Sequence, residues 1–210
     1  MKYNIKEEHF RVAIYGSARI KRGDKIYRLV YDLAKKIGKE ELDIVTGGGP
    51  GLMDAASRGH FAGDTNNNAH SIGLAIRLPK EQKESYHLEI KKEFHLFSKR
   101  LDEFMRWSNI FVVAPGGVGT ILELLYTWQL MQTKFTCEVP IILLGDMWPP
   151  LLEWIKKYPL KKGLLNREDL RVFYCVKTSD EAFKIIKKAH ELYKKGGKNG
   201  CINYNKYKLN

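Results

Sequence analysis

A glycine-rich segment that ends in a carboxylate is the most chemically informative part of the sequence. Pro115-Gly116-Gly117-Val118-Gly119-Thr120-Ile121-Leu122-Glu123 directly follows the apolar run at 110–114. A strand that leads into a glycine turn and then a helix presents free backbone amides and positive helix-end potential to an anion such as phosphate. Phosphate binding alone does not need the negative charge of Glu123 close by. The segment therefore indicates an enzyme that acts on a phosphorylated substrate.

Two further glycine turns follow apolar runs. Gly16-Ser17-Ala18-Arg19 comes after residues 11–15, and Gly47-Gly48-Gly49-Pro50-Gly51 comes after residues 42–46. One such turn is more often a tight strand–helix connection than a ligand site. Open α/β sheets bind ligands beyond the carboxyl ends of their strands, so three of these turns predict a shared site. None matches the Walker A pattern or the dinucleotide fingerprint, which argues against those nucleotide-binding motifs.

Apolar runs of strand length alternate along the chain with segments of helical period. We predict strands at 11–15, 42–46, 71–76, 110–114, 139–144 and 171–176. The apolar faces of two helices are predicted at Ile26, Leu29, Val30, Leu33, Ala34 and Ile37, and at Ile121, Leu124, Leu125, Trp128 and Met131. A long helix is predicted from the spacing of Ile90, Phe94, Phe97, Leu101 and Phe104. Strands that are apolar throughout and alternate with helices favour an α/β fold, a doubly wound parallel sheet of Rossmann-like type with helices on both faces.

Length and composition are those of one globular domain. We expect a single Rossmann-like nucleotide-binding domain over residues 1–195 and a basic polar tail over 196–210. The first residues contain no apolar signal-peptide core, and no apolar run approaches the length of a membrane span. Cys137, Cys175 and Cys201 are widely spaced, without a metal-ligand pattern, and are typical of reduced thiols. These features predict a cytoplasmic protein without a membrane partner.

The net charge of +12 raises the alternative of nucleic-acid binding. Much of the excess lies in residues 184–210, where lysines are opposed by Glu191 alone. Neither a helix-turn-helix nor a zinc module is visible in the sequence. A solvated helix face and a polar tail explain the charge better, so nucleic acid is not the partner we expect.

The three glycine motifs, taken in this order, resemble those of the Lonely Guy (LOG) family, whose members were long described as possible lysine decarboxylases. Residues 71–74 and 78–82 look like its longer, second-type bacterial branch. The resemblance covers residues 11–154. It implies a hydrolase that cleaves the N-glycosidic bond of a cytokinin riboside 5′-monophosphate or AMP to a free base and ribose 5-phosphate. It also implies a reaction without metal or cofactor, and a homodimer with its active sites at the subunit interface.

Carried over to this sequence, the resemblance makes Glu123 and Arg100 the catalytic residues. Arg100 is placed by its spacing before Pro115, but the family usually has a lysine directly after this arginine, whereas here Lys99 precedes it and Leu101 follows. Lys99 is therefore the alternative to Arg100.

Phosphate and sugar binding are assigned in the same way. The phosphate-binding residues implied by the resemblance are Ser17, Gly116, Gly117, Val118, Gly119 and Thr120, and those at the sugar end are Gly48 and Gly49. Breaking a ribosyl C–N bond builds positive charge on the sugar, which a carboxylate at Glu123 would stabilise.

Other interpretations remain open from the sequence alone. Thr120 and Glu123 have the spacing of a helix capping box, and Arg100 has the spacing to pair with Glu103 on a helix surface. The same fold and turns also suit a carrier that holds a phosphorylated cofactor such as molybdopterin without reacting it, or a protein that only binds nucleotides. The preferred base and any assembly beyond a dimer are not indicated.

Overall fold

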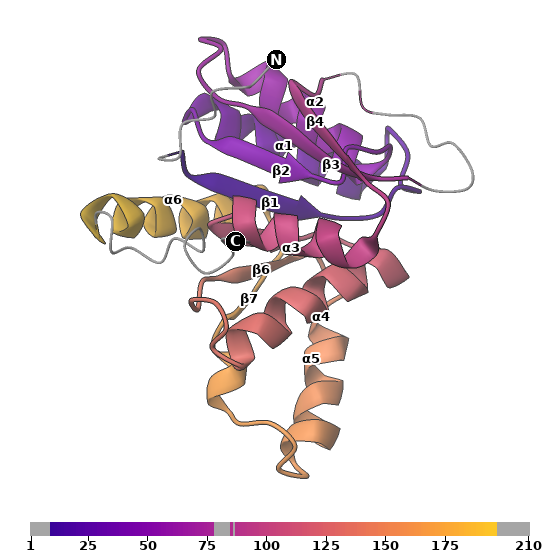
Figure 1. Cartoon of the computed structure of the whole chain (residues 1–210), viewed down its shortest axis with the longest axis vertical. Coiled ribbons are helices and arrows are strands. Elements are labelled where there is room, and N and C mark those ends of the chain that lie inside the picture. The colour runs from indigo at the N-terminus through magenta and orange to yellow at the C-terminus, as the bar shows by residue number, and fades with distance from the viewer. Residues whose placement is uncertain (1–8, 78–84, 86, 197–210) are drawn as a thin grey trace.

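Seven parallel strands form one sheet in the computed structural model, which describes residues 9–77, 85 and 87–196 (Figure 1). The strands are β1 (Arg11–Tyr15), β2 (Asp43–Thr46), β3 (Ser71–Ile76), β4 (Ile90–Phe94), β5 (Ile110–Val113), β6 (Ile141–Leu144) and β7 (Phe173–Val176). Their order across the sheet is β4-β3-β2-β1-β5-β6-β7. The order reverses between β1 and β5, so the predicted doubly wound α/β fold is confirmed.

Helices cover both faces of this sheet. They are α1 (Lys25–Lys39), α2 (Leu52–Gly63), α3 (Phe97–Trp107), α4 (Val118–Gln132), α5 (Pro149–Ile155), a short π-helix η1 (Lys156–Leu160), a 3₁₀ turn η2 (Glu168–Leu170) and α6 (Ser179–Gly196). Helices α1, α2 and α6 lie on one face, whereas α3, α4 and α5 lie on the other (Figure 1).

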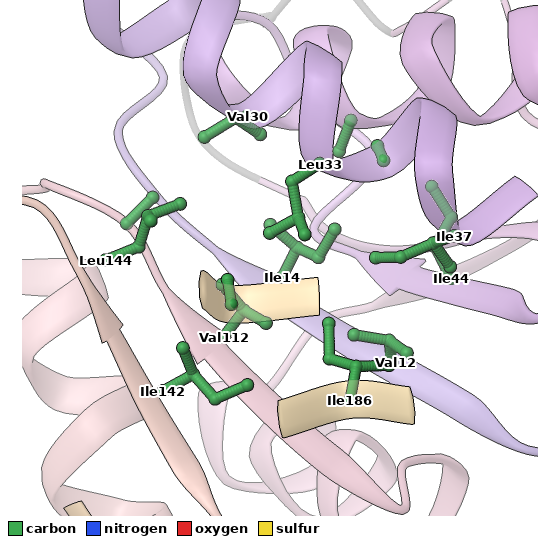
Figure 2. Packing of buried hydrophobic residues seen from close by; sticks show 14 of the residues in the cluster. Val12, Ile14, Val30, Leu33, Ile37, Ile44, Val112, Ile142, Leu144 and Ile186 are labelled. Atoms are coloured by element: carbon green, nitrogen blue, oxygen red, sulfur yellow. The ribbon is translucent and has the colours of Figure 1, made fainter. Parts of the chain in front are cut away.

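Each strand supplies side chains to both faces because successive residues of a strand point to opposite sides. In β1, Val12 and Ile14 belong to the core under α1 and α6, whereas Ala13 and Tyr15 belong to the core under α3 and α4. Figure 2 shows the first of these cores, with the labelled residues Val12, Ile14, Val30, Leu33, Ile37, Ile44, Val112, Ile142, Leu144 and Ile186. Burial on both faces explains why the central strands β1, β5 and β6 have no polar face in the sequence.

The apolar face predicted for α1 is confirmed. Val30, Leu33, Ala34 and Ile37 are buried against the sheet. The helix begins after Asp24, whose side chain accepts a hydrogen bond from the backbone N–H of Ile26 at 2.7 Å. This N-cap satisfies one of the amides that the first helical turn leaves without an acceptor.

The long helix predicted from residue 90 is wrong in its first part. Residues 90–94 form β4, which pairs in parallel with β3 so that Ile72 lies opposite Ile90. Ile90 and Phe94 are four residues apart, a spacing that fits a helix and also one face of a strand, so the apolar pattern alone did not separate the two. The helix α3 begins only at Phe97. The strands predicted at 139–144 and 171–176 are shorter, at Ile141–Leu144 and Phe173–Val176.

The prediction for α4 is correct for Leu124 and Met131, which are buried, but wrong for Leu125, which is exposed. This helix is apolar on nearly all sides, so its sequence does not single out one buried face.

Further predictions concern membrane spans, the cysteines and the C-terminal tail. No helix among the described residues is long and apolar enough to cross a membrane. Cys175 is a free, exposed thiol, whereas Cys137 is disulfide-bonded, so the prediction of reduced thiols is wrong at Cys137. Sequence spacing alone does not show which cysteines meet in a fold. Cys201, residues 78–82 and the tail after Gly196 lie outside the described residues.

Candidate active site

The loops after β1, β2 and β5 meet at the carboxyl edge of the sheet, where the strand order reverses. The backbone N–H of Ser17 donates to the carbonyl of Pro115 at 3.1 Å, and the N–H of Leu52 donates to the carbonyl of Ser17 at 2.9 Å. These bonds hold the three glycine motifs together around one cavity of about 490 Å³. This volume lies within the range of small-molecule sites.

Seven of the predicted site residues line this cavity: Ser17, Arg100, Gly117, Val118, Gly119, Thr120 and Glu123. Other lining residues, which the sequence analysis did not assign to the site, include Tyr15, Arg19, Gly47, Met53, Ile76 and Phe97. Arg19 and Gly47 stand inside motifs that the sequence already marked. Ile76 and Phe97 belong to no sequence motif, and they reach the cavity only because of where β3 and α3 lie in the fold.

Arg100 and Glu123 form a buried ion pair in this cavity. Nη2 of Arg100 donates to Oε1 of Glu123 at 2.8 Å. Arg100 is only 9% exposed and Glu123 only 7%. A second bond holds the guanidinium in place, since its Nε donates to the carbonyl of Leu74 at 2.8 Å. Arg100 is therefore not a surface residue paired with Glu103, and the exposed Lys99 does not take its position.

Burial raises the pKa of Glu123 to about 7, and the neighbouring Arg100 guanidinium opposes this shift. Withdrawal of a carboxylate from water disfavours its charged form, and an adjacent cation favours it. Glu123 is therefore a carboxyl group that changes its protonation state close to neutral pH. Such a group suits acid–base or electrostatic catalysis.

Tyr15 also lines the cavity and lies close to this pair. Its hydroxyl lies 3.3 Å from Oγ1 of Thr127, one helical turn after Glu123. Burial and the nearby Glu123 raise the pKa of Tyr15, so its hydroxyl stays neutral. A neutral hydroxyl adds no charge that would compete with the ion pair.

The N-terminus of α4 forms a further wall of the cavity. Gly117 is its N-cap residue and Val118 its first helical residue. A Cβ atom built on Gly117 or Gly119 would meet no other atom within 4 Å, so the backbone here is open to a ligand. Because the first turn of a helix has amides without intrahelical acceptors, this wall can bind an anion.

Gly116 and Thr120 have a structural role at the same turn. A Cβ atom on Gly116 would lie 2.1 Å from Oγ1 of Thr120, so the turn needs glycine at this position. The capping-box interpretation is wrong, because the N-cap is Gly117, its helix has no side-chain cap hydrogen bond, and Glu123 lies in the second turn, bonded to Arg100.

Gly48 and Gly49 are not among the residues that line the cavity. Gly48, with φ of +70°, packs against Gly73, whose Cα would lie 3.2 Å from an added Cβ. Gly47 lines the cavity instead, and an added Cβ there would lie 2.7 Å from Nη2 of Arg100 and 2.7 Å from Sδ of Met53. The motif thus contributes to the site through its first glycine.

Asp54 ties the surrounding loops to one another. It accepts hydrogen bonds from the hydroxyl of Tyr27 at 2.8 Å and from Nε of Arg58 at 3.0 Å, and it also bonds Ser85 and Arg22. These bonds connect α1, α2 and the chain that follows β3. No group of histidine, cysteine, aspartate and glutamate in the described part of the chain has the arrangement of a metal site.

Known proteins resemble the chain in sequence and in fold. The sequence model of the family described as "Possible lysine decarboxylase" matches residues 53–186. A rice (Oryza sativa subsp. japonica) protein named "Probable cytokinin riboside 5′-monophosphate phosphoribohydrolase LOGL2" is 30% identical over 191 residues, which cover 86% of this chain and 72% of that protein.

A second relative is much longer than this chain. The Escherichia coli K12 protein named "Pyrimidine/purine nucleotide 5′-monophosphate nucleosidase" is 29% identical over 143 residues, which are 64% of this chain but only 30% of that protein. Among solved structures, the molybdenum cofactor binding protein of Rippkaea orientalis superposes with a TM-score of 0.65 over 86% of this chain and 96% of its own, at 17% identity. That low identity supports a common fold alone.

The family model covers well over half of the chain, and the match includes Arg100, Glu123 and the glycine turn at the start of α4. The rice relative extends the similarity over most of the remaining sequence. The chain is therefore a member of the LOG family, the proteins described as possible lysine decarboxylases.

Proposed function

We propose that the chain hydrolyses the N-glycosidic bond of a nucleoside 5′-monophosphate to a free base and ribose 5-phosphate. The buried Arg100–Glu123 ion pair, in the same cavity as the open N-terminus of α4, supports this proposal most directly. The helix end suits a phosphate, and the carboxylate suits a cation that develops nearby. The two relatives named for this chemistry support the same assignment.

In this reaction the bond between C1′ and the base nitrogen breaks, and its electron pair leaves with the base. The ribose carries positive charge in the transition state, which the ionised Glu123 stabilises. Water then forms the new C1′–O bond, and its proton passes through Glu123 to the departing base. Arg100 holds the Glu123 carboxylate in place and stabilises negative charge on the leaving base.

The phosphate is assigned to the amides of Gly117, Val118, Gly119 and Thr120, together with the hydroxyl of Ser17. Binding energy from this unreactive group positions the ribose against Glu123. Gly116 supports the turn, and Gly47 replaces Gly48 and Gly49 at the sugar end. No cofactor enters this mechanism.

Two other functions have less support. Decarboxylation of lysine uses a lysine Schiff base to pyridoxal phosphate, and no lysine is among the described residues that line the cavity. A carrier of a phosphorylated cofactor needs the anion-binding wall but gains nothing from a buried carboxylate whose ionisation opposes the phosphate charge.

A homodimer is part of the proposal. Val118, Leu122 and Leu125 follow one another along the outer side of α4 and are 85%, 42% and 42% exposed. Helices that are apolar all round are usually buried on all sides, so a second copy of the chain suits this stripe. Val118 also lines the cavity, which supports an interface close to the site. A Leu122→Glu variant that stays dimeric in light scattering would contradict this arrangement.

The activity is tested by incubation of the purified protein with AMP, isopentenyladenosine 5′-monophosphate and adenosine, followed by chromatography of free base. We expect base from the two monophosphates and at least about 100-fold less from adenosine, because adenosine lacks the phosphate that positions the ribose. Equal rates with adenosine would contradict the assigned phosphate site.

The cytoplasmic location and the membership of the second-type bacterial branch stay predictions.

A further inference from the structure

The cavity has two chemically different ends. On the side of β1 and β5 it is lined by the polar turn with Ser17 and by the backbone of Gly117 and Gly119. From α2, β3 and α3 it is lined by apolar side chains, namely those of Met53, Ile76 and Phe97. Arg100 and Glu123 line the same cavity. The contacts of α3 and of Gly47 show where Arg100 lies relative to the apolar end.

Phe97 and Arg100 lie on one face of α3, since residues three apart on a helix are neighbours. Gly47 borders both Nη2 of Arg100 and Sδ of Met53. Ile76, the last residue of β3, lies opposite Phe94 in β4, three residues before Phe97. Across the sheet, β1 separates β2 and β3 from β5, which leads into α4. The apolar side chains are therefore next to Arg100, on the side away from the N-terminus of α4.

Phe97 is 50% exposed although it lines this cavity. A large aromatic ring at a cavity wall leaves a flat apolar surface uncovered by the rest of the fold. Aromatic rings stack on nucleobases largely irrespective of base identity, because every base has a π face. Met53 adds a flexible thioether, which adapts to ligands of different outline.

We infer that Met53, Ile76 and Phe97 form the base-binding end of the cavity and that Phe97 is the residue on which the base stacks. This inference rests on the proposed hydrolysis of nucleoside monophosphates and adds the orientation of the substrate. The phosphate lies at α4, the ribose at Glu123 and the base beside Phe97. Such an apolar end accepts adenine and also adenine that carries an apolar substituent.

The test compares a nucleotide with the same molecule without its base. Binding of AMP and of ribose 5-phosphate is measured by calorimetry for wild type, Phe97→Ala, Phe97→Tyr and Phe61→Ala, with hydrolysis rates for AMP in parallel. Phe61 is a matched control because it is 60% exposed and is not among the residues that line the cavity. Light scattering and melting temperature show whether each variant keeps its fold and assembly.

We expect Phe97→Ala to weaken AMP binding about tenfold and to leave ribose 5-phosphate binding within about twofold of wild type. Its KM rises more than its kcat falls, because stacking acts equally on ground and transition states. Phe97→Tyr, which keeps an aromatic ring, restores most of the AMP affinity that Phe97→Ala loses, and the control Phe61→Ala behaves as wild type.

Unchanged AMP binding by Phe97→Ala, or an equal loss for AMP and ribose 5-phosphate, would overturn the inference while the hydrolase function stands. If Phe97→Ala does not fold, Phe97→Leu replaces it, with the same expected split between the two ligands. A wild-type protein that neither binds nor hydrolyses a nucleoside monophosphate would overturn both the function and this inference.

Discussion

Replacing Glu123 with glutamine is expected to change how the stability of the protein depends on pH. Burial raises the pKa of Glu123 to about 7 in the folded protein, above the reference value of 4.5. The folded state therefore holds a proton on Glu123 that the unfolded chain releases between these two pH values. Stability from this group is fully present below about pH 4.5 and is lost as the pH rises through about 7.

The magnitude follows from the difference between the two pKa values. Each unit corresponds to about 1.4 kcal/mol, so the whole window from 4.5 to 7 amounts to about 3 kcal/mol. Most of this change falls between about pH 5 and pH 8. A guanidinium stays protonated throughout this range. In Glu123→Gln, the loss of the ion pair with Arg100 therefore changes the free energy of unfolding by nearly the same amount at every pH.

The assay is urea unfolding of wild type and Glu123→Gln at pH 5, 6, 7 and 8. We expect the free energy of unfolding of wild type to fall by about 2–3 kcal/mol relative to the variant across the series. Glu153→Gln, at an exposed position on α5, serves as the control for loss of one surface carboxylate. A constant difference between wild type and Glu123→Gln would show that Glu123 does not titrate in this range. A difference of opposite sign would show that Arg100 outweighs burial.

Three further substitutions test the geometry of the site. Gly119→Ala adds a methyl group in open space at the start of α4. We expect urea unfolding to show a helix stabilised by up to about 1 kcal/mol. Initial rates should show a KM for the nucleotide that is at least about tenfold higher, because the methyl group occupies the phosphate site. Gly47→Ala places a Cβ 2.7 Å from Nη2 of Arg100, so hydrolysis should fall at least about tenfold with little change in melting temperature. Asp54→Ala removes the acceptor of Tyr27 and Arg58, and urea unfolding should report a loss of about 1–2 kcal/mol. Wild-type values for any of these would contradict the contact concerned.

The fold was largely predictable because the central strands of a two-faced parallel sheet are buried on both sides and therefore read as continuous apolar runs. The strand at 11–15 matches β1, and the helix face from Val30 to Ile37 is buried as predicted. The error at residues 90–94 arose because an edge strand with one buried face and a short helix share the same apolar spacing. Pairing with β3 decides between them, and pairing is a long-range contact that local spacing does not contain.

The residues proposed here as catalytic could be picked out from the sequence, but the shape of the cavity could not. Glu123 and Arg100 meet although they are 23 positions apart in the sequence. The glycine-rich motif drew attention to Glu123, whereas Arg100 was identified only through the family resemblance. Phe97 and Ile76 reach the cavity through the relative positions of α3 and β3, which no short motif reports. Gly48 has a positive φ and packs against Gly73, whereas the adjacent Gly47 borders Arg100 and Met53, and the glycine-rich sequence does not distinguish the two.

The rate of base release from AMP by Glu123→Gln tests the central claim most directly. Wild type and variant are compared at pH 8, where the Glu123 carboxyl of wild type is mostly ionised, and AMP binding of both is measured by calorimetry. Cleavage by the variant that is slower by at least about 100-fold, with AMP binding within a few-fold of wild type, is the result we predict. A variant that binds AMP and releases adenine at the wild-type rate would contradict the assignment of Glu123 as the catalytic carboxylate.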